Sequence, residues 1–222
     1  MNNLIVNESS KNIRALALQA LRGNWWIAVG AAVLSTLLIM GPALFIQELM
    51  SGRTSFELFL INIENLLIGA PITLGLIIFM FSLFKKEEAQ IGQIFNGFDY
   101  FLKAVTLKVI ISIFVMLWTF CFIIPGVIAS IRYSQAFYIL AEDPSKGVMQ
   151  CIEESKWMMH GNKWKFFCLV LSFFGWALLA AIPAGIGYLW LIPYFSMTQI
   201  AFYELVSGNL KHETLEGHSY EQ

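Results

Sequence analysis

The sequence predicts an all-α, polytopic membrane protein. Of its 222 residues, 58% are hydrophobic and only 13% are charged, whereas a soluble domain carries about 25% charged residues. Arg132 is the one charged residue in four long stretches, which are 23–47, 65–84, 109–141 and 166–203. These observations favour six transmembrane helices in three hairpins, with a cytoplasmic amphipathic helix at the membrane surface before each hairpin.

The first two stretches each fit one helix across a hydrocarbon core of about 30 Å. The later two, 109–141 and 166–203, would be about 50 and 57 Å long as single helices at about 1.5 Å per residue. Each also contains helix breakers near its middle, Pro125-Gly126 in one and Pro183-Ala184-Gly185 in the other. Proline removes a helical donor and glycine tolerates a sharp turn, so each stretch is predicted to fold back as a hairpin.

The distribution of charge supports six spans with both termini in the cytoplasm of a plasma-membrane protein. In this topology only Arg53 falls outside and Arg132 is embedded, while Glu48, Glu57 and Glu64 lie in the first external loop. The other 12 of the 14 basic residues lie inside: Lys11, Arg14, Arg22, Lys85, Lys86, Lys103, Lys108, Lys146, Lys156, Lys163, Lys165 and Lys211. If 109–141 crossed only once, this positive-inside bias would largely vanish.

Three amphipathic stretches, 9–23, 88–103 and 143–160, precede the predicted hairpins. Their apolar residues recur at helical spacing, which is typical of helices that lie at a membrane surface. In the third stretch, Asp143-Pro144 is expected to form the cap and first turn, and Gly161 the stop.

Similar short sequences at two places in the chain indicate an internal repeat. Gly23-Asn24-Trp25-Trp26 precedes the first predicted span, and Gly161-Asn162-Lys163-Trp164 precedes the fifth. Duplication is one explanation; the other is that glycine, asparagine and tryptophan simply suit helix entry at the lipid headgroups. We expect one integral membrane domain over 1–207 and a polar cytoplasmic tail over 208–222.

The candidate polar layer inside the membrane consists of Arg132, Gln135 and Gln199. Arg132 and Gln135 are one helical turn apart, and Gln199 could face them from the sixth span. An intramembrane arginine is costly unless it is paired, and it is a functional candidate for that reason. Backbone carbonyls, a lipid phosphate, or an outer carboxylate such as Glu48 or Glu64 are its possible partners. A structural role, bonded to a broken helix or snorkelling outward, is the favoured reading of Arg132.

Signatures of catalysis and of cofactor or metal binding are missing from the sequence. It has no phosphate-binding glycine loop, no G-x-S-x-G and no H-E-x-x-H. Its three cysteines and three histidines show neither disulfide nor metal-ligand spacing. The net charge of −1 argues against nucleic acid as a partner. No enzyme activity, no cofactor and no metal are expected, and the expected partners are membrane lipids, with other membrane proteins left open.

A long pattern carries a family resemblance. Residues 125–165 contain R-Y-S-Q-A-F-Y-I-L-A-E-D-P, followed by S-K-W-M-M-H-G-N-K-W. Together with the N-terminal A-L-A-L-Q-A-L-R-G-N-W-W, this closely resembles a bacterial integral membrane family known as domain of unknown function 975. The block is also distantly similar to the membrane-anchor region of some bacterial glycerophosphodiester phosphodiesterases. The resemblance implies a helical membrane fold, and it carries over neither an activity nor any site residue.

Two functional hypotheses follow. The leading one is a non-enzymatic plasma-membrane protein that acts through lipid or protein contacts, in envelope maintenance, antimicrobial-peptide tolerance or support of a membrane complex. The alternative is a small transporter with a polar site between helical repeats around Arg132, Gln135 and Gln199. A transporter should show a wet cavity that reaches this layer, whereas a scaffold should show closely packed small residues.

Overall fold

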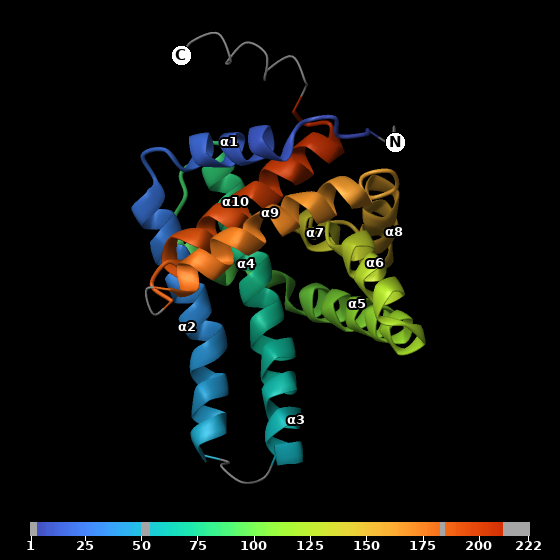
Figure 1. Ribbon diagram of the computed structural model, residues 1–222. Helices are drawn as coiled ribbons and strands as arrows, with labels where there is room; N and C mark the ends of the chain where they lie inside the picture. Colours follow the sequence, from blue (N-terminus) through green and yellow to red (C-terminus); the bar gives the residue numbers. More distant parts are fainter. Residues whose placement is uncertain (1–3, 50–53, 183–184, 211–222) are drawn as a thin grey trace.

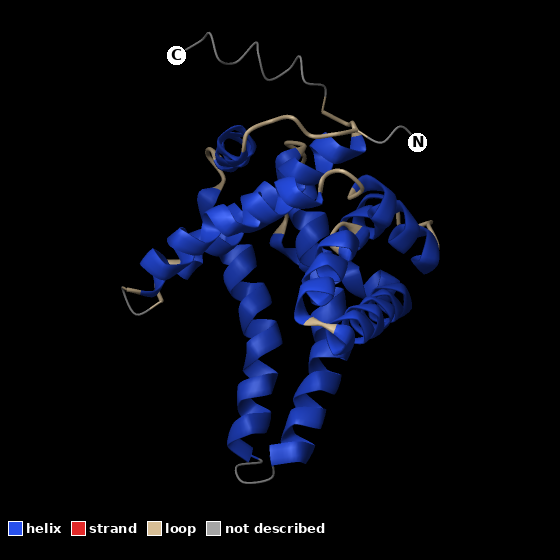
Figure 2. Ribbon diagram, turned by 45° about the vertical axis from the view of Figure 1, so that its right-hand side comes forward, coloured by secondary structure: helices blue, strands red, loops and turns tan. Residues whose placement is uncertain are grey.

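The computed structural model describes residues 4–49, 54–182 and 185–210, and all regular secondary structure in these ranges is helical (Figure 1, Figure 2). In chain order the elements are α1 (Ser10–Leu21), α2 (Trp25–Leu49), α3 (Thr54–Glu64), the π-helical turn η1 (Asn65–Gly69), α4 (Ala70–Phe84), the 3-10 helix η2 (Ile91–Tyr100), α5 (Phe101–Cys121), α6 (Ile123–Tyr133), α7 (Ala136–Glu142), α8 (Val148–Met158), α9 (Lys163–Ala181) and α10 (Tyr188–Ser207).

The described helices form three hairpins that diverge from a common base. The first pairs α2 with the run of α3, η1 and α4, the second pairs α5 with α6, and the third pairs α9 with α10. In Figure 1 the first hairpin points straight down from the base, while the other two splay to the right and left. Helix α1 lies across the top of the base, where Leu4 contacts Gly208 near the end of α10.

Within the described residues, five helical segments are long and apolar enough to cross a membrane: Trp25–Leu49, Phe56–Phe84, Ile91–Cys121, Ile123–Glu142 and Lys163–Ala181. The sixth predicted span corresponds to α10, which is 20 residues long but is not one of these segments. Gln199, Glu204 and three tyrosines interrupt the apolar sequence of α10. The all-α class with several apolar helices is therefore confirmed.

The second apolar span begins earlier than the sequence predicted. A span over 65–84 was expected, with Glu57 and Glu64 in an external loop, but the helix is already formed in α3 and the apolar segment starts at Phe56. The predicted span was taken to begin directly after the charged residue Glu64. A helix can continue through such a residue because its backbone hydrogen bonds do not depend on side-chain polarity.

The first amphipathic stretch is confirmed as a helix, and the other two are corrected in form. Helix α1 starts where predicted, with the Ser9 hydroxyl accepting from the Asn12 N–H at 3.1 Å. The stretch 88–103 contains a 3-10 helix that runs directly into α5. In the third stretch α8 ends at Met158, earlier than the stop predicted at Gly161, and Gly161 has φ +86° in the turn that leads to α9.

The start of the third amphipathic helix was predicted wrongly. Asp143 does not cap it, since the helix begins at Val148 after Gly147. The Asp143 carboxylate instead accepts from the backbone N–H and the hydroxyl of Ser145, at 3.1 and 2.5 Å. Aspartate side chains readily stabilise such turns in place of helix, which explains the later start.

The proposed repeat is visible in the backbone of the first and third units. Gly23 and Gly161 both have positive φ, +84° and +86°, and each is followed by asparagine and a new helix. The side chains differ in role, because Asn24 is exposed and Asn162 is fully buried. The second unit has no such break between η2 and α5.

The Asn162 side chain joins the N-terminal segment to the base by hydrogen bonds. Its amide oxygen accepts from the Val6 N–H at 2.9 Å, and its amide nitrogen donates to the carbonyls of Leu4 and Met158, both at 2.8 Å. Because the Asn162 side chain has no solvent exposure, these bonds replace water for both backbone segments. The beginning of the chain is thereby held against the end of α8.

The closest backbone contact joins α4 to η2. A Cβ atom added to Gly75 would overlap the carbonyl oxygen of Ile94, and one added to Gly97 would overlap the carbonyl oxygen of Pro71. The two elements cross where neither has a side chain, in the way that small residues allow helices to approach in membranes. This contact brings the fully buried Ile94 into the main hydrophobic core.

We expect Gly75→Ala and Gly97→Ala each to destabilise the protein by about 3 kcal/mol or more, because the added methyl group meets rigid backbone. Gly92→Ala is the matched control, since it lies in the same 3-10 helix with nothing within 4 Å of an added Cβ. Thermal unfolding in detergent measures the effect. Equal melting temperatures for all three variants would contradict the close contact.

Candidate functional site

The residues of the predicted polar layer, Arg132, Gln135 and Gln199, lie in three different elements or junctions. Arg132 lies in the last turn of α6, Gln135 in the break before α7, and Gln199 in α10. The Gln135 side-chain amide donates to the Ser134 hydroxyl at 2.9 Å, while the side-chain oxygens of Gln135 and Gln199 are buried without a partner. Among the described residues, no hydrogen bond or ion pair joins the three side chains.

Ser155 bonds the backbone at the junction of α6 and α7. From α8, its hydroxyl donates to the carbonyl of Arg132 at 2.9 Å and accepts from the N–H of Gln135 at 3.2 Å. Ser134 and Gln135 keep right-handed helical dihedral angles, so this junction is a local irregularity within the apolar segment Ile123–Glu142. Ser155 therefore supplies side-chain partners where the regular helical bonding is interrupted.

The Arg132 guanidinium is half-buried, and within the described part of the chain it makes no ion pair. Neither Glu48 nor Glu64, the two outer carboxylates considered as partners, pairs with it. Of the two structural roles expected for Arg132, a bond from its guanidinium to a broken helix is not found among the described residues, and outward snorkelling stays a prediction.

A polar network at the base joins the ends of α7 and α10. The Tyr203 hydroxyl donates to Glu142 at 2.5 Å, and the Asn209 side chain donates to the other oxygen of Glu142 at 2.7 Å. The Tyr203 ring stacks on Tyr138 with centroids 5.9 Å apart, and Phe81 of α4 meets the Tyr203 ring edge-on at 5.5 Å. This network joins α4, α7 and α10, and both carboxylate oxygens of Glu142 accept hydrogen bonds within it.

The turn between α7 and α8 is held by Lys103 of α5. The Lys103 ammonium donates to the carbonyls of Pro144 and Lys146, at 2.5 and 3.2 Å. Lys146 in turn forms an ion pair with the buried Glu154 at 2.8 Å. The hydroxyl and the N–H of Ser145 hold the pKa of the Asp143 carboxyl below its usual value. The residues of the E-D-P-S-K sequence, 142–146, thus have structural roles in or next to this turn.

An apolar groove of about 410 Å³ runs between α9 and α10. It is lined by Phe167, Val170, Leu171, Phe173, Phe174, Ala177, Tyr188, Leu191, Ile192, Phe195 and Ser196. The Tyr188 hydroxyl is already bonded to the Ala177 carbonyl at 3.0 Å. The Phe173 ring forms one wall of the groove, and the Arg14 guanidinium lies over this ring, 6.0 Å from its centroid. The groove therefore combines an apolar lining with a nearby cation.

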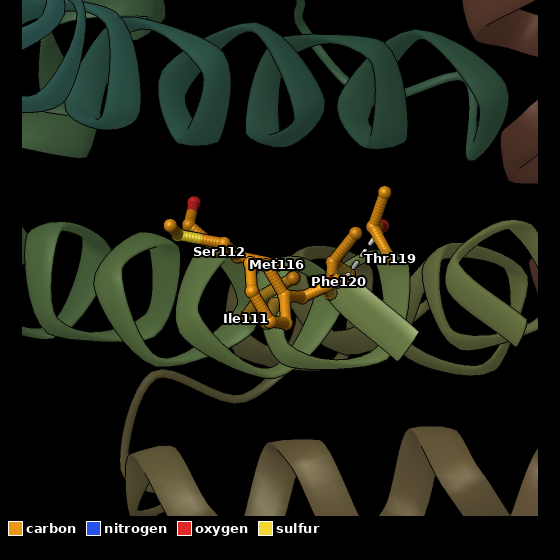
Figure 3. A pocket seen from close by; sticks show the side chains of 6 residues that line it. Ile111, Ser112, Met116, Thr119 and Phe120 are labelled. Atoms are coloured by element: carbon orange, nitrogen blue, oxygen red, sulfur yellow. Dashed lines mark hydrogen bonds between the residues drawn. The ribbon is translucent and has the colours of Figure 1, made fainter. Parts of the chain in front are cut away.

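A second, shallower groove of about 620 Å³ follows one face of α5 (Figure 3). Its lining residues are Ile111, Ser112, Val115, Met116, Thr119 and Phe120. Figure 3 shows the side chains of Ser112 and Thr119 pointing to the same side of the helix. The Thr119 hydroxyl donates a hydrogen bond to the Val115 carbonyl at 2.8 Å. Lys108 lies one turn before Ser112 on this face, so a cation is again close to an apolar groove.

Glu64 is the residue of interest that sequence reasoning placed wrongly. Its side chain is 8% exposed, and within the described part of the chain both buried carboxylate oxygens have no hydrogen-bond partner. The available signal was the apolar run Leu58-Phe59-Leu60-Ile61, which with Ile63 places hydrophobic residues before Glu64 as well as after it.

Apolar helices, exposed hydrophobic side chains along the hairpins and two apolar grooves define a helical protein compatible with multi-pass membrane insertion. The family described as "Protein of unknown function (DUF975)" matches residues 1–130 and 120–210. The chain belongs to this family, as the sequence pattern indicated. No curated protein and no solved structure matches the chain.

We expect Ser155→Ala to lower the free energy of unfolding by about 1–3 kcal/mol, because it leaves buried backbone groups at the α6–α7 break unpaired. Arg132→Ala is the matched comparison, since it removes the guanidinium and keeps the carbonyl that Ser155 binds. Thermal unfolding in detergent should show a clear loss for Ser155→Ala and a small change for Arg132→Ala. The reverse order would restore a structural role to the guanidinium.

Proposed function

We propose that the protein is a non-enzymatic, multi-pass protein of the plasma membrane that acts by binding phospholipid along its hairpins. The observation that carries this proposal is the α9–α10 groove, an apolar channel with lining residues from both helices. Its shape and lining fit an acyl chain, and a groove of this chemistry offers little to a polar substrate. Envelope maintenance is the cellular role that fits best with lipid binding.

Charge favours a phospholipid over a neutral lipid. Arg14 lies against the Phe173 wall of the groove and makes no ion pair within the described residues. An anionic headgroup near Arg14 would allow the acyl chain to follow the groove between α9 and α10. Lys108 and the groove along α5 repeat the same combination of cation and apolar surface.

The proposed topology has six spans, with α10 as the last, and both termini in the cytoplasm. Support comes from the layout, in which the hairpins diverge from one base that contains α1 and the end of α10 (Figure 1). The predicted cytoplasmic segments carry 12 of the 14 basic residues, which matches the positive-inside rule. Exposed apolar side chains cover the far ends of the hairpins, among them Phe45, Leu49, Phe120, Ile123, Ile182 and Trp190.

The transporter alternative lacks a specific observation in its favour. It requires a polar site around Arg132, Gln135 and Gln199, but neither of the two grooves described above is lined by any of these residues. Partner proteins stay a further possibility for the same exposed surfaces, and phospholipid is the occupant to which we commit.

Topology is tested with reporters fused to the C-terminus. We expect a fluorescent protein to mature there and alkaline phosphatase to stay inactive, because the fusion point would be cytoplasmic. A phosphatase fusion in the first hairpin loop, between α2 and α3, is the control and should be active. An active phosphatase at the C-terminus would rule out six spans.

The lipid site is tested by filling the groove. We expect Ala177→Trp to reduce co-purifying phospholipid several-fold, because an indole would occupy the space meant for an acyl chain. Ala181→Trp is the matched control, one turn further along α9 at an exposed position outside the groove lining. Phospholipid bound per protein is measured by native mass spectrometry after detergent exchange. Equal phospholipid in wild type, Ala177→Trp and Ala181→Trp would refute this site.

A further inference from the structure

Glu64 lies inside an apolar helical segment, where an isolated carboxylate is costly. The segment runs from Phe56 to Phe84, and Glu64 is more than nine-tenths buried with both oxygens unpartnered. An ionised carboxylate without hydrogen bonds or a counter-charge is strongly disfavoured in such surroundings. The Glu64 side chain therefore needs a bound cation that neutralises it.

The backbone is interrupted at the same depth on both sides of the first hairpin. On one side, the π-helical turn η1 begins at Asn65, directly after Glu64. On the other, Pro42 inside α2 has no N–H, so the carbonyl of Leu38 loses its usual helical donor. Single π-helical turns are frequent at functional sites, and interrupted membrane helices supply carbonyls that bind cations.

The lengths of the helices bring these features to one level. Glu64 lies ten residues beyond the start of α3 at Thr54, and Leu38 lies eleven residues before the end of α2 at Leu49. At about 1.5 Å per residue, both are roughly 15–17 Å from the end of the hairpin. Because α2 packs against α3 and η1, the Leu38 carbonyl, which lacks its usual helical donor, and the Glu64 carboxyl lie at matching depth on neighbouring helices.

Among the described residues, the charged groups on the elements around Glu64 do not provide it with a counter-ion. Its own helix α3 also carries Glu57, and α2 carries Glu48 at its far end. Neither η1 nor α4 contains a charged residue. Helix α5, which packs on η1, carries Lys103 and Lys108. Lys103 is committed to the α7–α8 turn, and in the described ranges Lys108 forms no ion pair with Glu64.

We propose that Glu64, with the broken backbone of η1 and α2, forms a membrane-embedded site for a small monovalent cation, a proton or Na⁺. With a proton, the neutral carboxyl has an O–H that can donate to a freed carbonyl such as that of Leu38. With Na⁺, the carboxylate and freed carbonyls supply oxygen ligands, which hard cations prefer. Either cation neutralises Glu64, so its occupancy controls how tightly the first hairpin packs. This site is separate from the phospholipid groove and does not depend on it.

The test is carboxyl labelling of the purified full-length protein in liposomes with dicyclohexylcarbodiimide, an apolar reagent that reacts with protonated carboxyls. The carboxyl oxygen bonds to the carbodiimide carbon and its proton moves to a carbodiimide nitrogen. We expect Glu64 to be labelled at neutral pH, as found by peptide mass spectrometry, and labelling to fall as the pH rises. Glu57 on the same helix is the internal control and should be labelled at least several-fold less.

Ion substitution separates the two cations. Labelling that depends on pH alone and is equal in Na⁺ and choline identifies a proton site, whereas protection by Na⁺ at constant pH identifies a sodium site. Pro42→Ala tests the backbone partner, because restoring a donor to the Leu38 carbonyl should shift the pH midpoint of Glu64 labelling downward or weaken Na⁺ protection. An unchanged midpoint and unchanged protection would remove α2 from the proposed site.

Three results would overturn the proposal: no labelling of Glu64, equal labelling of Glu57, or equal labelling of Glu64 by a water-soluble carbodiimide. Glu64→Gln mimics the neutral carboxyl in size and polarity, so it should fold, and its melting temperature should not change with pH or Na⁺ where that of wild type does. A pH and Na⁺ response that persists in Glu64→Gln would place the cation site elsewhere.

Discussion

The backbone contact between α4 and η2 is the constraint on which the arrangement of the hairpins depends. Gly75 and Gly97 allow the two elements to touch without intervening side chains, so their separation and crossing are fixed. Helix α4 also packs against α2, α5, α7 and α10, which makes it the central element of the described fold. Because η2 runs directly into α5, fixing η2 on α4 also fixes the direction in which the second hairpin leaves the base.

Divergence of the hairpins explains why the outer surface remains apolar. Polar contacts gather at the base, where Lys103, Glu142 and Asn162 connect segments distant in the sequence. Towards their far ends, the hairpins have few other helices to contact, so large hydrophobic side chains and two grooves stay uncovered. In a bilayer, lipid would cover these surfaces, and this exposure is the basis of the lipid-binding function that we propose.

At the candidate site, residue spacing along the chain does not predict which side chains interact. Arg132 and Gln135 are one turn apart in the sequence, yet no hydrogen bond joins their side chains in the described ranges, and Ser155 from another helix bonds the backbone between them. Glu64 was assigned to a loop because it is charged, yet it lies in an apolar helix beside a π-helical turn. The apolar residues before Glu64 indicated a longer helix, but the burial of Glu64 and the bonds made by Ser155 depend on what packs against each segment.

The sequence by itself determined the helical class, the compatibility with a membrane, the family, and the presence of the first amphipathic helix after Ser9. These follow from hydropathy, periodicity and turn chemistry, which act over a few residues. The tertiary structure decided that η2 lies on α4 and that Ser155 bonds the junction between α6 and α7. It also decided that Glu64 is left buried without a partner. The physical reason is that these features depend on contacts between residues far apart in the chain, where packing and desolvation override local preference.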